Sequence, residues 1–133
     1  MTDLSHRSIL LVEDEPLLAM DVEACLTAAR YRVVGPATTV TEALHLIRQE
    51  RPDLALLDLN LGIEMANSLP DVLAAQRIPF IILSGHSRAK VPAPHRERPF
   101  LQKPYVATIL LRTVHDTLND ARNWSLRQQV SHR

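Results

Sequence analysis

Several features that would place this chain in other classes of protein are missing from it. Its one cysteine, Cys25, excludes an internal disulfide, and no CxxC or cysteine–histidine pairing offers a zinc site. Lysine plus arginine and aspartate plus glutamate both number 15, so the chain lacks the basic surplus of a dedicated nucleic-acid binder. The apolar run near the N-terminus is too short for a signal peptide or a membrane span. We therefore expect a cytoplasmic protein that binds neither nucleic acid nor membrane.

What the chain does contain is enough for one globular domain. Its 133 residues are 46% apolar and 23% charged, which fits a packed core and not a disordered segment. The three glycines, at 35, 62 and 85, follow predicted strands, where a permissive backbone is needed. We divide the chain into a domain over 1–122 and a tail over 123–133, which either frays or extends the last helix.

Short apolar runs recur along the chain at the spacing of strands separated by helices. Continuous apolar runs, without polar alternation, are typical of strands buried on both faces of a parallel sheet. The runs lie at 8–12, 32–35, 54–57, 80–83 and 100–101, and the second is the weakest. The sequence therefore predicts five strands.

Helical periodicity fills most of the intervals between these runs. The first helix follows Pro16, and Thr39 with Glu42 forms a capping box that starts the second. A third helix is predicted over roughly 68–76, and the last follows Pro104. Alternating strands and helices imply an α/β fold, with one open parallel sheet and helices on both faces.

The segment 86–98 interrupts this alternation. Pro92 and Pro94 would break a helix there, so the sequence predicts a loop or a single turn. The segment is also basic, which fits either a solvated loop or a docking patch.

Polar residues of a particular kind follow the strong strands. Glu13 and Asp14 follow the first run, Asp58 the third, Ser84 the fourth and Lys103 the fifth. In a parallel sheet these ends share one edge, where ligands of open α/β folds bind. Each residue alone fits an ordinary loop, but together they predict a pocket of carboxylates, a hydroxyl and an ammonium group.

Carboxylates crowded into such a pocket need positive charge among them. Two carboxylates about 4 Å apart repel by roughly 4 kcal/mol at an effective dielectric constant of about 20. The candidates for the compensating charge are Lys103 and a divalent metal. Because the available ligands are oxygens, the metal would be a hard ion: Mg²⁺, or else Mn²⁺ or Ca²⁺.

The segments that carry these residues resemble the signature blocks of response-regulator receiver domains of two-component signalling. The blocks are ILLVEDEPLLA (9–19), PDLALLDLNLG (52–62), PFIILSG (79–85) and PFLQKPY (99–105). The likeness extends from Ser8 to Leu118, and PFIILSG with the segment after it is similar to a single-domain, alphaproteobacterial subgroup. The resemblance implies a flavodoxin-like, doubly wound five-stranded parallel sheet of order 2-1-3-4-5, with a short or missing fourth helix.

The resemblance also implies roles for the acidic residues. Asp58 would accept a phosphoryl group from the phosphohistidine of a histidine kinase or a histidine phosphotransfer protein. Glu13, Asp14, Asp58 and the backbone carbonyl of Asn60 would hold Mg²⁺, with Asp14 as a direct ligand and Glu13 acting through water.

The remaining matched residues would contact the phosphoryl group and report its arrival. Lys103, joined to Pro104 by an expected cis bond, would pair with a phosphoryl oxygen, and Ser84 would contact the group through its hydroxyl. Ser84 and Phe100 would form the switch that changes a protein-binding surface. Such a domain catalyses its own phosphorylation and dephosphorylation and is not an enzyme that turns over an external substrate.

Three alternatives follow from the same residues. We expect no second domain after Leu118, so the output would be contact with an unidentified protein, or the chain would be a phosphate sink. The broken segment 86–98 fits instead an interaction module that keeps the fold but does not switch. A flavin-binding or hydrolytic enzyme is disfavoured, because EDEP (13–16) would repel a phosphate in the absence of a metal and no GxSxG motif is present.

Overall fold

The protein alternates strands and helices along its whole described length. The structure, a computed structural model, describes residues 6–58 and 63–131, and within 63–68 and 122–131 it describes the backbone alone. The elements are β1 (Ser8–Val12), α1 (Pro16–Ala28), β2 (Arg32–Ala37), α2 (Val40–Glu50), β3 (Leu54–Asp58), α3 (Ile63–Ala75), β4 (Phe80–Ser84), β5 (Phe100–Gln102) and α4 (Ala107–Ser131).

All five strands pair in parallel, in the order β2-β1-β3-β4-β5. This confirms the predicted flavodoxin-like topology. The chain leaves β1 toward one side of the sheet to form β2 and later crosses back to form β3 on the other side. Ligands of such sheets bind at this reversal, beyond the carboxyl ends of the strands. The ends of β1 and β3 therefore frame the expected site.

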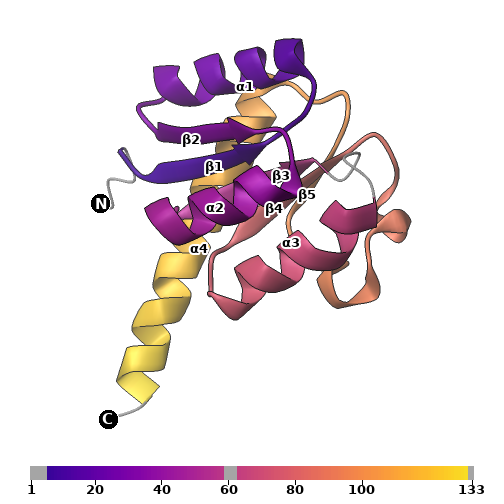
Figure 1. Ribbon diagram of the computed structural model, residues 1–133. Helices are drawn as coiled ribbons and strands as arrows, with labels where there is room; N and C mark the ends of the chain where they lie inside the picture. Colours follow the sequence, from indigo (N-terminus) through magenta and orange to yellow (C-terminus); the bar gives the residue numbers. More distant parts are fainter. Residues whose placement is uncertain (1–5, 59–62, 132–133) are drawn as a thin grey trace.

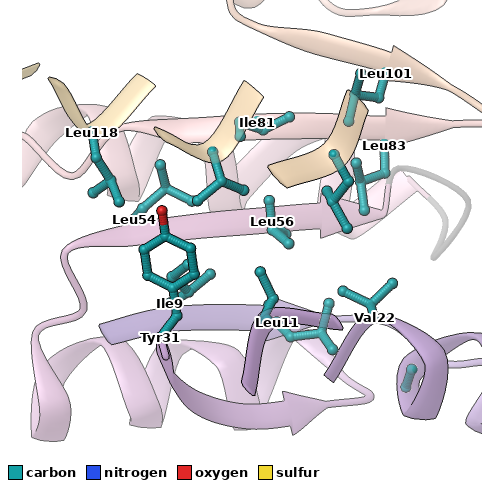
Figure 2. Close-up of a cluster of buried hydrophobic side chains, with 14 residues drawn as sticks. Ile9, Leu11, Val22, Tyr31, Leu54, Leu56, Ile81, Leu83, Leu101 and Leu118 are labelled. Carbon is teal, nitrogen blue, oxygen red and sulfur yellow. The ribbon is translucent and has the colours of Figure 1, made fainter. Parts of the chain in front are cut away.

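Helices cover both faces of the sheet, two on each (Figure 1). On one face, α1 and α4 pack against alternate strand residues such as Ile9, Leu11 and Leu56. Figure 2 shows this cluster, with strand side chains projecting from neighbouring strands toward the helices. On the other face, α2 and α3 pack against the intervening residues, such as Leu10 and Leu57. Because both faces are covered, the strands need the uninterrupted apolar runs seen in the sequence.

The helices begin and end close to the predicted positions. Two details differ: the hydrogen-bond partner of the Glu42 carboxylate in the predicted capping box, and the start of α3. Thr39 caps α2 by accepting a hydrogen bond from the Glu42 amide at 3.1 Å, while the Glu42 carboxylate accepts one from the Thr38 hydroxyl. The α3 helix begins at Ile63, earlier than the predicted 68, and contains Pro70.

The last helix is the longest described element, and it continues from Ala107 to Ser131. The backbone of 123–131 is therefore helical, and the C-terminal half of α4 extends beyond the sheet (Figure 1). The division of the chain at residue 122 stays a prediction. None of the described helices combines the length and apolar character that crossing a membrane requires.

The β4–β5 connection, residues 85–99, contains no α-helix, as the prolines predicted. Two 3₁₀ turns, Arg88–Lys90 and Ala93–His95, stand where the other strand connections have helices. The connection is tied to α3 by His95, whose buried Nε2 lies 2.6 Å from the Asp71 carboxylate. Without an α-helix, the connection is held by the backbone hydrogen bonds of its turns and by side-chain contacts such as this one.

A bulge in β2 sets the position of the chain beside the end of β1. Leu10 pairs with Val34 but Val12 pairs with Ala37, so β2 contains one more residue than β1 across this interval. Gly35 has a φ of 96°, which favours glycine, and a Cβ there would lie 2.7 Å from the Ala37 amide nitrogen. The Ala37 carbonyl in turn accepts the Glu13 amide hydrogen bond at 2.9 Å.

We predict that Gly35→Ala destabilises the protein by about 1–3 kcal/mol, because the methyl group meets backbone and the φ is unfavourable. Urea unfolding measures the loss, and Gly85→Ala, at an exposed glycine, is the control. An unchanged unfolding midpoint for Gly35→Ala would show that the bulge tolerates a side chain.

Candidate functional site

Three carboxylates meet at the carboxyl edge of the sheet, beyond β1 and β3. Glu13, Asp14 and Asp58 each offer an oxygen, and these oxygens lie within 4.8 Å of one another. Glu13 and Asp58 are 1% and 0% exposed, whereas Asp14 is exposed to solvent. The end of β1 thus contributes one buried and one accessible acid, and β3 contributes the buried Asp58.

Lys103 brings a positive charge to the two buried acids. Its Nζ donates hydrogen bonds to Asp58 Oδ2 at 3.1 Å and to Glu13 Oε1 at 3.4 Å. The Lys103 amide donates to the Ser84 carbonyl at 2.7 Å, which fixes the backbone next to the end of β4. The bond from Lys103 to Pro104 is cis, as predicted.

The charges at this edge shift the pKa values of the groups around them. Burial, followed by the hydrogen bond and repulsion from Asp58, raises the pKa of Glu13 to about 7. Burial alone would lower the pKa of Lys103, but its bonds to Asp58 and Glu13 outweigh that effect and raise it. Lys103 is therefore firmly charged, and one ammonium group does not fully compensate the crowded acids.

The donor set fits a small hard cation. Ligands on opposite sides of an octahedral Mg²⁺ ion lie about 4.2 Å apart, since each Mg–O distance is about 2.1 Å. Carboxylate oxygens within 4.8 Å of one another can adjust to that spacing. The exposed position of Asp14 would leave room for the waters that Mg²⁺ retains. A cation here would also favour the ionised form of Glu13 and so lower the pKa of its carboxyl group.

Ser84 ends β4 at the edge of the sheet that carries the cluster, and Phe100 begins the neighbouring strand β5. Ser84 is buried, and its Oγ accepts a hydrogen bond from the His86 amide at 2.9 Å. Phe100 is half-buried against the α2–α3 side of the core, and the Arg88 guanidinium lies 5.2 Å from its ring centre. The hydroxyl and the ring are therefore both in contact with the β4–β5 connection.

The structure brings together five of the predicted residues: Glu13, Asp14, Asp58, Ser84 and Lys103. Phe100 begins β5, where it pairs with Ile82, two residues before Ser84, and Asn60 lies outside the described residues.

Tyr105, two residues after Lys103, was not among the predicted site residues. Its hydroxyl is buried and has no hydrogen-bond partner among the described residues. Burial, with the nearby charges of Glu13 and Asp58, raises the pKa of Tyr105 to about 12. The phenol therefore stays neutral beside the acids. Its closeness to Lys103 in sequence was the one available signal.

Comparison with known proteins agrees with this geometry. The family model of the response regulator receiver domain matches residues 9–115. The chain belongs to this family. Receiver domains are signalling domains of two-component systems and not enzymes that turn over an external substrate.

Curated relatives include single-domain and larger regulators. PhyR of Methylorubrum extorquens is 35% identical over 101 residues, which cover 73% of this chain and 38% of PhyR. The chemotaxis protein CheY of Bacillus subtilis is 26% identical over 121 residues, which cover 87% of this chain and 100% of CheY. The chain thus spans all of CheY but well under two thirds of PhyR.

Solved receiver structures share the same fold. SdrG from Pseudomonas melonis, determined in a BeF₃-activated conformation, is 37% identical with a TM-score of 0.70, covering 84% of this chain and 98% of SdrG. PhyR from Brucella abortus is 27% identical with a TM-score of 0.75, covering 96% of this chain and 52% of PhyR.

We predict that Lys103→Met lowers the free energy of unfolding at neutral pH by about 2–3 kcal/mol, because it leaves buried carboxylates without their cation. Added Mg²⁺ should recover part of the loss by supplying positive charge. Urea unfolding with and without Mg²⁺ measures both effects, and Lys90→Met, at an exposed lysine, is the control. Equal stability of the Lys103→Met and wild-type proteins would contradict this account of the charges.

Proposed function

We propose that the chain is a response regulator that accepts a phosphoryl group on Asp58 from a histidine kinase or a histidine phosphotransfer protein. The observation that carries this proposal is the placing of the Asp58 carboxylate beside the Lys103 ammonium, within the same cluster as Glu13 and Asp14. A carboxylate held in this way can act as a nucleophile toward phosphorus. Lys103 already lies where it can balance the negative charge of the phosphorylated product.

In the proposed reaction an oxygen of Asp58 attacks the phosphorus of a phosphohistidine. The P–N bond breaks, the imidazole leaves with the bonding electron pair, and an acyl phosphate forms on Asp58. Lys103 neutralises charge on the transferred oxygens, and its position does not depend on the donor because the Ser84 carbonyl fixes its backbone.

Glu13, Asp14 and Asp58 would hold Mg²⁺, or Mn²⁺ in its place, with the carbonyl of Asn60 as a further ligand. When bound, the ion supplies positive charge to the phosphoryl oxygens. The exposed Asp14 is suited to direct ligation, and the buried Glu13 to ligation through water, because Glu13 already bonds Lys103.

The proposed switch uses Ser84 and Phe100. In the structure the Ser84 hydroxyl accepts a bond from the His86 amide, so a phosphoryl group on Asp58 would compete for that hydroxyl. Movement of Ser84 would change the space next to Phe100, whose ring is only half-buried. Phosphorylation would shift the population between these two packings, and a surface over β4 and β5 would change with it.

The alternative is a receiver that accepts phosphate as a sink, or binds partners without switching. The observation in its favour is the β4–β5 connection, which lacks an α-helix and is bound to itself through arginine side chains. Spectra with Mg²⁺ and beryllium fluoride, a phosphoryl mimic, discriminate between the two functions. Unchanged signals at Ser84 and Phe100 would favour the alternative.

A partner that carries the phosphohistidine must cover the site, and four exposed apolar side chains, called the apolar patch below, follow the site residues on two elements. Leu17 and Met20 are 77% and 62% exposed at the start of α1, directly after the acidic residues. Val106 and Ile109 are 62% and 45% exposed where α4 begins, just after Lys103. Since α1 and α4 pack on the same face of the sheet, the patch supports docking of the phosphodonor protein there.

We predict that Asp58→Asn abolishes phosphoryl labelling by acetyl phosphate with Mg²⁺, because the amide is not a nucleophile for phosphorus. Intact mass spectrometry detects the added phosphoryl group. Asp21→Asn, at an exposed acid of α1, should label like the wild type. Equal labelling of the Asp58→Asn protein would place the acceptor elsewhere and overturn the proposal.

We also predict that Leu17→Ser with Met20→Ser slows phosphotransfer from a histidine kinase about tenfold by weakening docking. Labelling by acetyl phosphate should not change, since a small donor needs no docking surface. His45→Ser, exposed on α2 at the opposite face of the sheet, controls for surface changes in general. Loss of labelling with both donors would mean that the patch supports the site itself.

A further inference from the structure

Arg88 connects the two residues of the proposed switch through the β4–β5 connection. We propose that Arg88 is a latch that holds Phe100 in the position seen here and ties that position to the hydroxyl of Ser84. The inference rests on the proposed function and adds the residue that sets the resting state of its switch.

The Arg88 guanidinium makes three contacts that restrain Phe100. Its Cζ lies 5.2 Å from the centre of the Phe100 ring, within the range of a cation–π contact. Its Nη1 donates hydrogen bonds to the Arg96 carbonyl at 2.8 Å and to the Arg98 carbonyl at 2.7 Å. These carbonyls lie just before β5. The Arg88 side chain therefore joins the start of the connection to its end and also covers the ring of Phe100.

The same segment is attached to Ser84. The Ser84 Oγ accepts the His86 amide hydrogen bond at 2.9 Å, and Arg88 begins the 3₁₀ turn two residues later. A hydroxyl drawn toward a phosphoryl group on Asp58 would give up this bond. The backbone that carries Arg88 would then be free to move, and the ring of Phe100 would lose its cover.

The other end of the connection is anchored more firmly. The Arg98 guanidinium lies 4.7 Å from the ring centre of Phe80, which is 1% exposed. The buried His95 packs its ring edge-on to Phe80 and pairs with Asp71 of α3. Phe100 is half-buried, so its contact with Arg88 is the one that can open without disturbing the core.

Removal of the latch should shift the resting population toward the switched state. The apparent affinity for a ligand that selects the switched state rises in proportion to the fraction of protein already in it. A cation–π contact and two charged hydrogen bonds at an exposed site justify a rise of about five- to thirtyfold in affinity for beryllium fluoride with Mg²⁺.

The chain offers a direct spectroscopic test because it has only two phenylalanines, Phe80 and Phe100. Protein labelled with fluorophenylalanine should give two fluorine signals. Arg88→Ala without ligand should move the Phe100 signal toward its beryllium fluoride position and should tighten beryllium fluoride binding. Arg98→Ala is the matched control: it removes the cation over Phe80 and should move only the Phe80 signal.

The outcomes separate the latch from the proposed function. A wild-type protein that does not bind beryllium fluoride with Mg²⁺ contradicts the proposed function, and the latch falls with it. A wild type that binds, together with an Arg88→Ala protein whose Phe100 signal and affinity are unchanged or whose affinity is weaker, contradicts the latch alone. If Arg88→Ala does not fold, Arg88→Lys decides. It keeps a cation but has a shorter reach toward the two carbonyls that Arg88 Nη1 bonds, so a smaller change in the same direction is expected, and no change overturns the latch.

Discussion

The structure depends on a concentration of negative charge in a place that water hardly reaches. Glu13 and Asp58 are almost fully buried at the ends of adjacent parallel strands, and Asp14 lies beside them. Repulsion between buried carboxylates is costly unless positive charge compensates it. Lys103 supplies part of that charge through contacts with both buried acids. A bound cation would compensate the remaining negative charge, and the arrival of a phosphoryl group would alter the same balance.

The rest of the fold holds these charges in place. Both faces of the sheet are packed with apolar side chains, so β1 and β3 cannot move apart to relieve the repulsion. The bulge at Gly35 gives Ala37 the position from which its carbonyl accepts the Glu13 amide. The Ser84 carbonyl holds the Lys103 amide in the same way from the other side. Backbone bonds on both sides of the site thus keep opposite charges close together.

The β4–β5 connection shows how a receiver domain can keep its order without a helix at this position. Arg88 and Arg96 donate to backbone carbonyls within the connection, Arg98 lies over Phe80, and His95 pairs with Asp71. The basic charge of the segment is therefore largely engaged in its own structure. This favours a structural role for its arginines over the docking patch that the sequence also allowed.

The sequence by itself determined the sheet, its order through family resemblance, and the residues at its carboxyl edge. Uninterrupted apolar runs specify buried parallel strands, and parallel strands bring their ends together wherever they lie in the chain. It also determined that prolines exclude a helix from 86–98. Only the tertiary structure decided that Glu13 is buried while its neighbour Asp14 is exposed. The contacts of Arg88 with Phe100 and of His95 with Asp71, and the start of α3 at Ile63, were likewise decided by the tertiary structure alone. Those features depend on contacts between distant segments, and neither periodicity nor spacing along the chain records such contacts.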